Sequence, residues 1–213
     1  MPTGSRIIGV DASPFVLGIG QEYELSEAHP IEYLLGDARR LPFPDRSFDM
    51  VVFANTLKYL GTEENELAAL QEHVRILRPG GQLLVVDGND SEITYRGADS
   101  DLSRRVVDGY SALQGDAQSG SRIADFFQLL GLRRVRQAVI PLRETEFTGR
   151  HAGFAMAQNM RDVLTEFAAT NPGDAIVSPP QLDSFCTQLG EAAVQGTYEW
   201  EYTKYAAVGI RPA

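Results

Sequence analysis

The sequence predicts an α/β fold with a mostly parallel sheet, helices on both of its faces and an antiparallel last strand. Short apolar runs alternate with segments of helical periodicity over residues 1–90, which is typical of parallel sheets with right-handed crossovers. An acidic or amide residue follows each run closely, namely Asp11, Asp37, Asn55 and Asp87. Residues 198–203 alternate between apolar and polar side chains, as expected of a strand with one buried face, and this strand continues to Val208 and Ile210.

The composition fits one globular domain. A chain of 213 residues, 43% hydrophobic and 23% charged, has the length for one α/β core with an insertion. Its formal charge of −10 disfavours nucleic acid and anionic membrane surfaces as partners, so we expect a small-molecule partner and leave a homodimer open. The single cysteine, Cys186, excludes an intrachain disulfide and fits a reducing compartment. No apolar run reaches the ~18 residues of a membrane span, and we expect a cytoplasmic protein.

The first predicted elements are two strands with a helix between them. Residues 6–10 and 31–35 are short runs rich in β-branched and apolar side chains. Ser13 is a suitable N-cap, and Pro14 a suitable first residue, for a helix over 14–28. Two glycines in this segment lower its helical propensity.

A strand at 48–53 precedes the clearest helix of the sequence. Thr62 can cap this helix, whose apolar positions recur at helical spacing: Leu67, Leu70, Val74 and Leu77. Gly80 and Gly81 end it, because two successive glycines favour a turn after a helix. Residues 82–86 then form a buried strand.

The second half of the chain begins with a polar stretch, 88–120, that still allows a loose amphipathic helix with Leu102, Val106 and Tyr110 on one face. Asn171 to Gly173 and Pro179 to Pro180 break the segment 143–196 into two helices. The predicted elements are, in order, a helix, a strand, two inserted helices and the last strand: 123–130, 132–142, 153–169, 180–195 and 198–210.

The stretch from Leu35 to Leu60 contains the predicted site. Asp37 follows one strand and Asn55 follows the next, so both side chains belong at the carboxyl ends of strands. Ligands of open α/β sheets bind in the crevice outside these ends. A carboxylate and an amide in this position are suited to contact a ligand such as a nucleoside.

Three segments, in this order and spacing, carry a resemblance to a known family: IIGVDASP (7–14), GDARRLPFPDRSFDMVVFANTLKYL (36–60) and EHVRILRPGGQLLVVD (72–87). They resemble the Rossmann-like, S-adenosylmethionine (SAM)-dependent methyltransferases, in particular the small-molecule group related to the ubiquinone/menaquinone-biosynthesis methyltransferases. The resemblance implies SAM as the cofactor and a methyl group transferred to a small molecule. The aromatic side chains of the last strand, Tyr198, Trp200 and Tyr202, and the Met and Phe residues of the insertion favour an apolar or aromatic acceptor. It also implies a partial cofactor-binding half over 1–92 and a substrate cap over the helical insertion 143–196.

The cofactor-binding residues implied by the resemblance are Asp11, Ala12, Asp37, Ala38, Asn55 and Leu57. Asp11 ends a strand where a carboxylate can accept two hydrogen bonds from a ribose diol; the alternative is a cap on the following helix. Asp37 would accept from the adenine amine and the Ala38 N–H would donate to the ring, unless Asp37 pairs with Arg39 or Arg40 instead. Asn55 would contact the amino acid part of the cofactor. Leu57 packs either on the adenine or in the core.

The catalytic residues cannot be assigned from the sequence. Methyl transfer from a sulfonium depends mainly on alignment of the reacting atoms, and a hydroxyl acceptor would add the need for a general base. Tyr59 and His151 are the two candidates for that base, although Lys58 and Tyr59 also fit a helix face. His29 and His73 are predicted at the surface, and no Cys, His and Asp cluster has the spacing of a metal site. Met156 and Met160, with nearby phenylalanines, could line a substrate cavity or pack on the sheet.

The family would be expected to have a strand, a glycine-rich loop and a helix before residue 6, and these are not in the sequence. In the family's sheet the strand in question lies between the strands ending at Asp11 and Phe53. Without it, both strands would keep unpaired backbone groups, at about 1–3 kcal/mol each if they are buried. We therefore expect a fragment or a miscalled start, with a degenerate protein or one completed by a partner chain as alternatives.

Two other functions remain open. A nicotinamide-dependent reductase would use Asp11 for the NAD ribose, but Asp37 and the antiparallel last strand are not expected there, and the glycine pattern upstream would discriminate the two enzymes. A methyltransferase-like fold retained as a binding or assembly module is the other alternative. Equilibrium binding of SAM or its demethylated product would separate that module from an enzyme.

Overall fold

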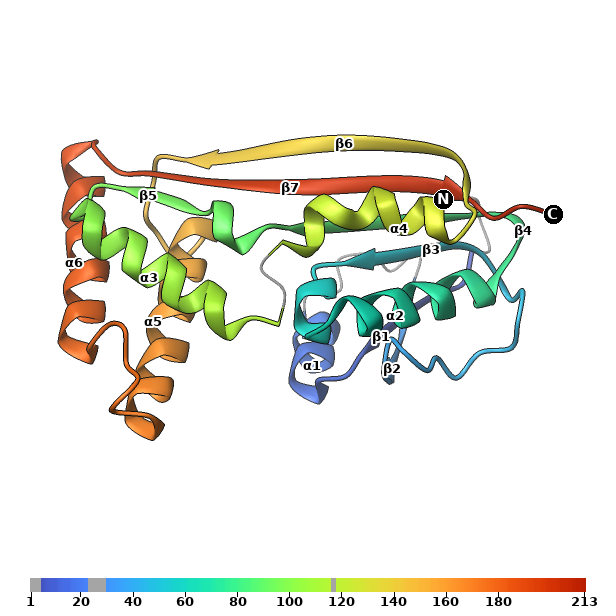
Figure 1. The fold of residues 1–213 in the computed structure, drawn as a ribbon, viewed down its shortest axis with the longest axis horizontal. Helices are drawn as coiled ribbons and strands as arrows, with labels where there is room; N and C mark the ends of the chain where they lie inside the picture. The colour runs from blue at the N-terminus through green and yellow to red at the C-terminus, as the bar shows by residue number, and fades with distance from the viewer. Residues whose placement is uncertain (1–4, 23–29, 116–117) are drawn as a thin grey trace.

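The structure, a computed structural model, describes residues 5–22, 30–115 and 118–213. The predicted α/β class is confirmed, but the strands form two sheets (Figure 1). β1 (Ile7–Asp11) pairs in parallel with β2 (Ile31–Leu35), and α1 (Pro14–Glu22) connects them on the described part of the chain. The end of the predicted helix over 14–28 lies outside the described residues.

The second sheet has the order β3-β4-β7-β5, with β6 also paired to β7. β3 is parallel to β4, whereas β7 runs antiparallel to β4, β5 and β6. The strands of this sheet are Phe48–Ala54, Leu77–Gly88, Thr94–Arg96, Arg133–Glu144 and Glu199–Ile210 for β3 to β7. Neither β1 nor β2 pairs with β3 in the described residues. This agrees with the prediction that the strand expected between β1 and β3 is not in the sequence.

The remaining helices fall into two groups, one on each half of the second sheet. α2 (Glu63–Ile76) and α4 (Ile123–Leu129) lie in front of one half in Figure 1. α3 (Ser100–Leu113), α5 (Ala152–Thr170) and α6 (Pro179–Gln195) gather at the opposite end of the molecule. Short 3₁₀ helices follow three strands or loops: η1 (Leu57–Leu60), η2 (Asp90–Glu92) and η3 (Ser119–Arg122).

Two hydrophobic clusters correspond to these groups. The cofactor-half cluster joins the inner sheet residues Phe53, Leu83 and Val85 to α2 and α4. The helical cluster joins α3, α5 and α6 to one another and to the start of β7, where Trp200 is 1% exposed. Each group of helices therefore has its own core, and β7 contributes to both.

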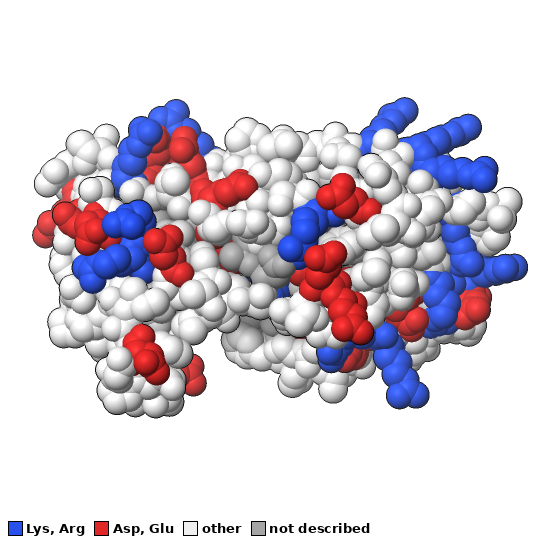
Figure 2. Space-filling model, in the orientation of Figure 1, with Lys and Arg blue, Asp and Glu red and all other residues white. Residues whose placement is uncertain are grey.

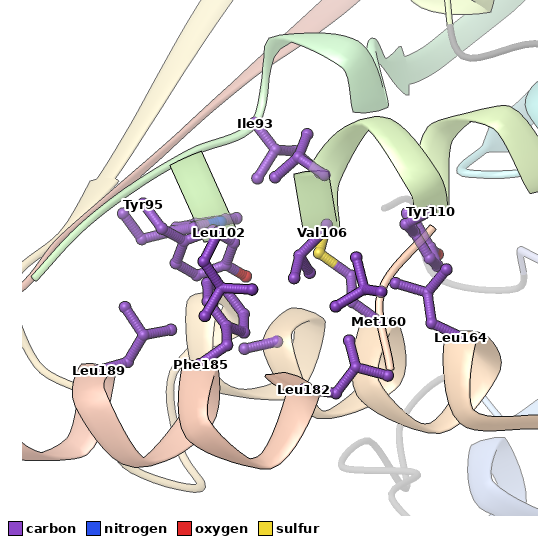
Figure 3. Close-up of a cluster of buried hydrophobic side chains, with 14 of the residues drawn as sticks. Ile93, Tyr95, Leu102, Val106, Tyr110, Met160, Leu164, Leu182, Phe185 and Leu189 are labelled. Atoms are coloured by element: carbon purple, nitrogen blue, oxygen red, sulfur yellow. The ribbon is translucent and has the colours of Figure 1, made fainter. Parts of the chain in front are cut away.

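The helical cluster shows what the apolar face of α5, the first inserted helix, packs against. Met160 and Leu164 of α5 point toward Val106 of α3 and Leu182 of α6 in Figure 3. Met160 is 0% exposed and Met156 packs beside the same cluster. The methionines thus pack in a core that joins α5 to α3, α6 and residues of β5 and β7, as the packing alternative predicts.

One face of the second sheet remains open. On β4, Leu83 and Val85 are 0% exposed, whereas Leu84 and Val86 point to the other face and are only half-buried. That face continues to β3, where Met50 is 50% and Val52 58% exposed. In the described residues, neither hydrophobic cluster includes these side chains. The prediction of helices on both faces holds for the molecule as a whole, but not for this half of the sheet.

Two predictions about α2 were wrong. The helix ends at Ile76 and not at the two glycines, because Leu77 is already extended. The guanidinium of Arg211 replaces the missing helical donors, since it donates to the carbonyls of Val74, Arg75 and Leu77. His73 is 5% exposed, not on the surface: its Nδ1–H donates to the Ala69 carbonyl at 2.6 Å and its ring packs on Phe53. Predicted His29 lies outside the described residues.

Charges of both signs are interleaved over most of the face in Figure 2. Positive side chains without acidic neighbours gather at the upper right, the end where β6 begins with Arg133, Arg134 and Arg136. These three arginines form no ion pair with the described residues. No helix within the described ranges is long and apolar enough to cross a bilayer.

Candidate cofactor and substrate site

Asp11 and Asp37 lie at the same edge of the first sheet. β1 and β2 are parallel neighbours, and the register pairs Asp11 with Leu35, two residues before Asp37. The Gly36 N–H donates to the Asp11 carbonyl at 3.0 Å, which draws the loop after β2 against the end of β1. Adjacent strands lie about 4.8 Å apart, so two carboxylates are held near each other outside the strand ends.

Asp11 makes a contact at the start of the following helix, close to the alternative role considered for it. Its Oδ1 accepts a hydrogen bond from the Ser13 N–H at 2.8 Å, and Ser13 Oγ accepts from Val16 N–H at 3.4 Å. The two side chains therefore share the start of α1. Asp11 Oδ2 has no hydrogen-bond partner among the described residues, and the next residue, Ala12, is exposed. One carboxylate oxygen is free for a ligand while the other holds the loop in place.

Asp37 makes the ion pair that was its alternative role. Arg39 donates to both of its oxygens, from Nη2 at 2.7 Å and from Nε at 3.0 Å, and the Arg39 N–H adds a bond at 2.8 Å. The Arg39 side chain holds the pKa of Asp37 below its usual range. Both side chains are about half exposed, so solvent screens the pair and its contribution to stability is small. A ligand could displace Arg39 at little cost.

Ala38 links the first sheet to the second. Its side chain packs against the cofactor-half cluster, the same cluster that contains Leu57. Leu57 is 1% exposed and contributes to this cluster, as its core role predicts. The structure therefore brings Ala38 and Leu57 into one cluster but assigns Leu57 to packing.

Asn55 ends β3 in a strained backbone conformation. Its φ is 54°, in the left-handed region that non-glycine residues rarely adopt. The Asn55 N–H donates to the Val86 carbonyl at 2.8 Å, and the exposed side chain accepts a hydrogen bond from Lys204 Nζ at 2.8 Å. Such strain often accompanies functional sites. No contact among the described residues joins Asn55 to Asp11.

Lys58 is not the helix-face residue that was predicted. It is 4% exposed, and its Nζ lies 2.8 Å and 2.9 Å from the two oxygens of Asp90, which is 0% exposed. The Tyr202 hydroxyl donates to the same carboxylate at 2.9 Å. Burial is the largest single influence on Lys58 and lowers its pKa, but the charge and hydrogen bonds of Asp90, with smaller contributions from Tyr59 and Asp87, together raise the pKa above its usual value. This network joins η1, η2 and β7 at the carboxyl end of the sheet.

Asp87 connects the same loops from the end of β4. Its Oδ2 accepts from the Leu57 N–H and its Oδ1 from the Gly88 N–H, both at 2.8 Å. Burial raises the pKa of this carboxyl, while the two N–H donors act in the opposite direction. The sequence predicted Asp87 only as a strand end. The lysine within the apolar run Leu57 to Leu60 was the signal that could have revealed the buried pair.

The two candidate bases occupy different surroundings. Tyr59 of η1 is 59% exposed and lies next to Lys58, whose Nζ is 5.1 Å from the ring centre. Its hydroxyl interacts with the buried Tyr110, whose pKa is raised by burial. His151 lies in the loop before α5, where Thr148 Oγ1 and Nδ1 are 2.8 Å apart and Glu146 lies 3.6 Å from Nε2. Only Tyr59 follows a strand of the parallel part of the sheet.

The arrangement can bind and orient, but it contains few groups for acid–base chemistry. In the part of the chain that the structure describes, no group of three His, Cys, Asp or Glu residues could hold a metal ion. Cys186 is half-buried beside the helical cluster, and burial raises the pKa of its thiol. Neither feature adds a reactive group to the strand ends.

Comparison with known proteins identifies the first part of the chain. Residues 1–85 match the family described as a methyltransferase domain. The ubiquinone/menaquinone biosynthesis C-methyltransferase UbiE of Pseudomonas savastanoi pv. phaseolicola is 36% identical over 87 residues, which cover 40% of this chain and 33% of the relative. The demethylmenaquinone methyltransferase of Listeria monocytogenes serotype 4a is 37% identical over 90 residues, covering 41% and 36%. The chain thus spans about a third of the length of these curated relatives.

Solved structures match nearly the whole chain, at lower identity. The YcgJ protein of Bacillus subtilis has a TM-score of 0.55 and 19% identity, and the match covers 98% of this chain and 83% of YcgJ. A putative methyltransferase of Bacillus halodurans has a TM-score of 0.56 and 17% identity, with coverage of 98% and 84%. At these identities the match concerns the fold. Residues 1–85 are thus similar to a methyltransferase domain and to the ubiquinone/menaquinone-biosynthesis methyltransferases, and the fold of the chain is that of the Rossmann-like methyltransferases.

Proposed function

We propose that this protein binds SAM and transfers its methyl group to a small-molecule acceptor. The observation that carries the proposal is the position of Asp11 and Asp37, at adjacent carboxyl ends of two parallel strands and inside the segment that matches the methyltransferase domain. This position suits a ligand with a sugar diol and a base. The relatives named above support the same reaction class.

The residues at the strand ends fit the adenosine part of SAM. The free Oδ2 of Asp11 would accept from the ribose, next to the exposed Ala12. Asp37 would accept from the adenine amine once Arg39 moves away, and the Ala38 N–H would donate to the ring. Bound SAM supplies a methyl carbon on a positively charged sulfur. The contribution of the chain is to hold that carbon in line with the acceptor and to exclude water.

The helical group supports the proposal of a substrate cap. Residues 143–196 supply α5 and α6, which enclose a core with α3 and the start of β7. Tyr198, Trp200 and Tyr202 had suggested an aromatic or apolar acceptor, but their rings are buried in this core and do not line an open site. The acceptor class stays a prediction. Tyr59, exposed between the two groups of helices, is the better placed of the two candidate bases.

Binding measurements on the purified chain test the proposal. Calorimetry should detect binding of SAM and of its product, S-adenosylhomocysteine, while NAD should not bind. Asp11→Ala removes hydrogen bonds to a charged acceptor and should weaken S-adenosylhomocysteine about tenfold or more. The matched control is Asp49→Asn, an 82% exposed aspartate at the opposite end of the strands.

Three results would count against the proposal. Binding of NAD without S-adenosylhomocysteine would indicate the reductase. No affinity for either ligand in a folded sample would contradict SAM-dependent catalysis. Equal losses for Asp11→Ala and Asp49→Asn would remove Asp11 from the site.

A further inference from the structure

The chain contains two lysines, Lys58 and Lys204, and the structure places them in contrasting situations. Lys58 is buried in an ion pair with Asp90. Lys204 is half-buried, and its Nζ donates to the neutral amide oxygen of Asn55 at 2.8 Å. No ion pair among the described residues involves Lys204, although the chain has 29 acidic residues against 19 basic ones. The positive charge of Lys204 therefore has no carboxylate partner among the described residues.

Lys204 lies at the boundary between the helical core and the open face of the sheet. On β7 it points to the same face as Tyr202, which is 5% exposed in the helical cluster, and as Ala206 and Val208, which are only half-buried. In the register it pairs with Gly88 at the end of β4. Its ammonium also reaches Asn55 at the end of β3. The lysine thus reaches across the carboxyl end of the sheet, where ligands of open α/β folds bind.

Among the described residues, Lys204 and Asn55 keep unused hydrogen-bond donors at this point. An ammonium has three N–H donors, and within the described part of the chain Lys204 uses one of them. The Asn55 amide oxygen is occupied by Lys204, and its Nδ2 has no partner among the described residues. The left-handed backbone conformation of Asn55, with a φ of 54°, sets the direction in which its side chain leaves the backbone. A carboxylate, which only accepts hydrogen bonds, is the complementary ligand.

We propose that Lys204 and Asn55 Nδ2 form an anchor for a carboxylate group of a bound ligand. Two sources share this chemistry: the methionine end of the methyl donor, and an acidic group on the methyl acceptor. The first source rests on the function proposed above, whereas the second requires only that an acidic ligand enters the crevice. The two can be separated because the adenosine part of the donor contacts other residues.

The experiment measures binding to the wild-type chain, to Lys204→Met and to Lys204→Arg by calorimetry. The donor probes are S-adenosylhomocysteine and 5′-methylthioadenosine, which has the adenosine and the sulfur but no carboxylate. The acceptor probe is benzoate, with benzamide as its uncharged counterpart. Arg136→Met is the matched control, because Arg136 is exposed on the same sheet face, paired with Val208 near the other end of β7. Melting temperatures verify that each variant is folded.

The donor source predicts that Lys204→Met weakens S-adenosylhomocysteine about tenfold or more. Methylthioadenosine should bind as before, and Lys204→Arg should restore part of the affinity. The acceptor source predicts that S-adenosylhomocysteine is unaffected and that Lys204→Met abolishes binding of benzoate alone. Both results support the anchor.

The proposal is overturned if Lys204→Met and wild type bind all four probes alike, including the case in which neither binds benzoate. It is also overturned if Arg136→Met has the same effect as Lys204→Met, since a general charge effect would then be enough. Failure of the proposed function looks different. In that case wild type binds neither adenosine probe, and the comparison of benzoate with benzamide alone decides whether the anchor exists.

Discussion

The two halves of β7 belong to one continuous strand but have different surroundings. In the first half, Trp200 and Tyr202 are buried among α3, α5 and α6. In the second half, the residues on the same face, Ala206 and Val208, are half-buried and belong to neither cluster, while Ala207 on the opposite face packs in the cofactor-half cluster. Alternation therefore predicts two faces, but which face is covered depends on elements far away in the sequence.

The largest expected difference between the halves comes from truncating their side chains. Trp200→Ala should lower the free energy of unfolding by about 3–5 kcal/mol, because it leaves a cavity in a packed core. Val208→Ala on the same face should cost roughly 1 kcal/mol or less. Urea unfolding followed by circular dichroism gives both values. Equal losses would mean that the second half is as well covered as the first.

The region where the two halves of β7 meet is stabilised by the buried ion pair of Lys58 and Asp90, to which Tyr202 of β7 donates a hydrogen bond. Asp90→Asn leaves a buried lysine without a counter-charge and should cost on the order of 3 kcal/mol. The double variant Lys58→Met with Asp90→Leu should recover most of that loss, because both charges are removed together. Asp101→Asn, at an exposed pair with Arg104, is the control and should change stability by less than about 1 kcal/mol. A small effect of Asp90→Asn would show that water reaches the junction.

His73 packs on Phe53, in the cluster that covers one face of the second half of β7. Protonation of His73 should therefore lower the stability of this part of the molecule. Burial lowers its pKa below the ordinary value of about 6.5. The unfolded chain therefore binds the proton first, and stability falls as the pH drops below about 6.5 toward the lowered pKa. Each unit of lowering corresponds to about 1.4 kcal/mol.

The measurement is the free energy of unfolding in urea at pH 8 and pH 5.5. The wild-type chain should lose stability between these values, and His73→Gln, which has no ring to protonate, should lose less. Parallel pH profiles for the two proteins would mean that His73 does not contribute.

Much of the fold could be predicted because the signals are local. Thr62 caps α2 by accepting from the Asn65 N–H, as the sequence indicates. The polar stretch before residue 120 contains a well-packed α3, since Leu102, Val106 and Tyr110 lie on one face. The three-residue β5 was missed, because so short a strand has no measurable alternation.

The site was predicted less well because its contacts are long-range. The strand-end positions of Asp11, Asp37 and Asn55 follow from the order of the strands. The partners of Lys58 and Lys204 lie 32 and 149 residues away along the chain, and periodicity contains no information about them. His73 was assigned to the surface because a histidine in an amphipathic helix has no sequence feature that reveals a buried ring on Phe53.

The smallest expected effect tests the open face itself. Val52→Thr replaces a methyl group by a hydroxyl at a position that is 58% exposed, so the free energy of unfolding should change by less than about 0.5 kcal/mol. The same substitution at Val85, which is 0% exposed on the neighbouring strand, buries a hydroxyl and should cost roughly 1–3 kcal/mol. Unfolding at two protein concentrations completes the comparison. If Val52→Thr is costly and its cost grows with protein concentration, the open face is covered by a second copy of the chain, because only association makes stability depend on concentration.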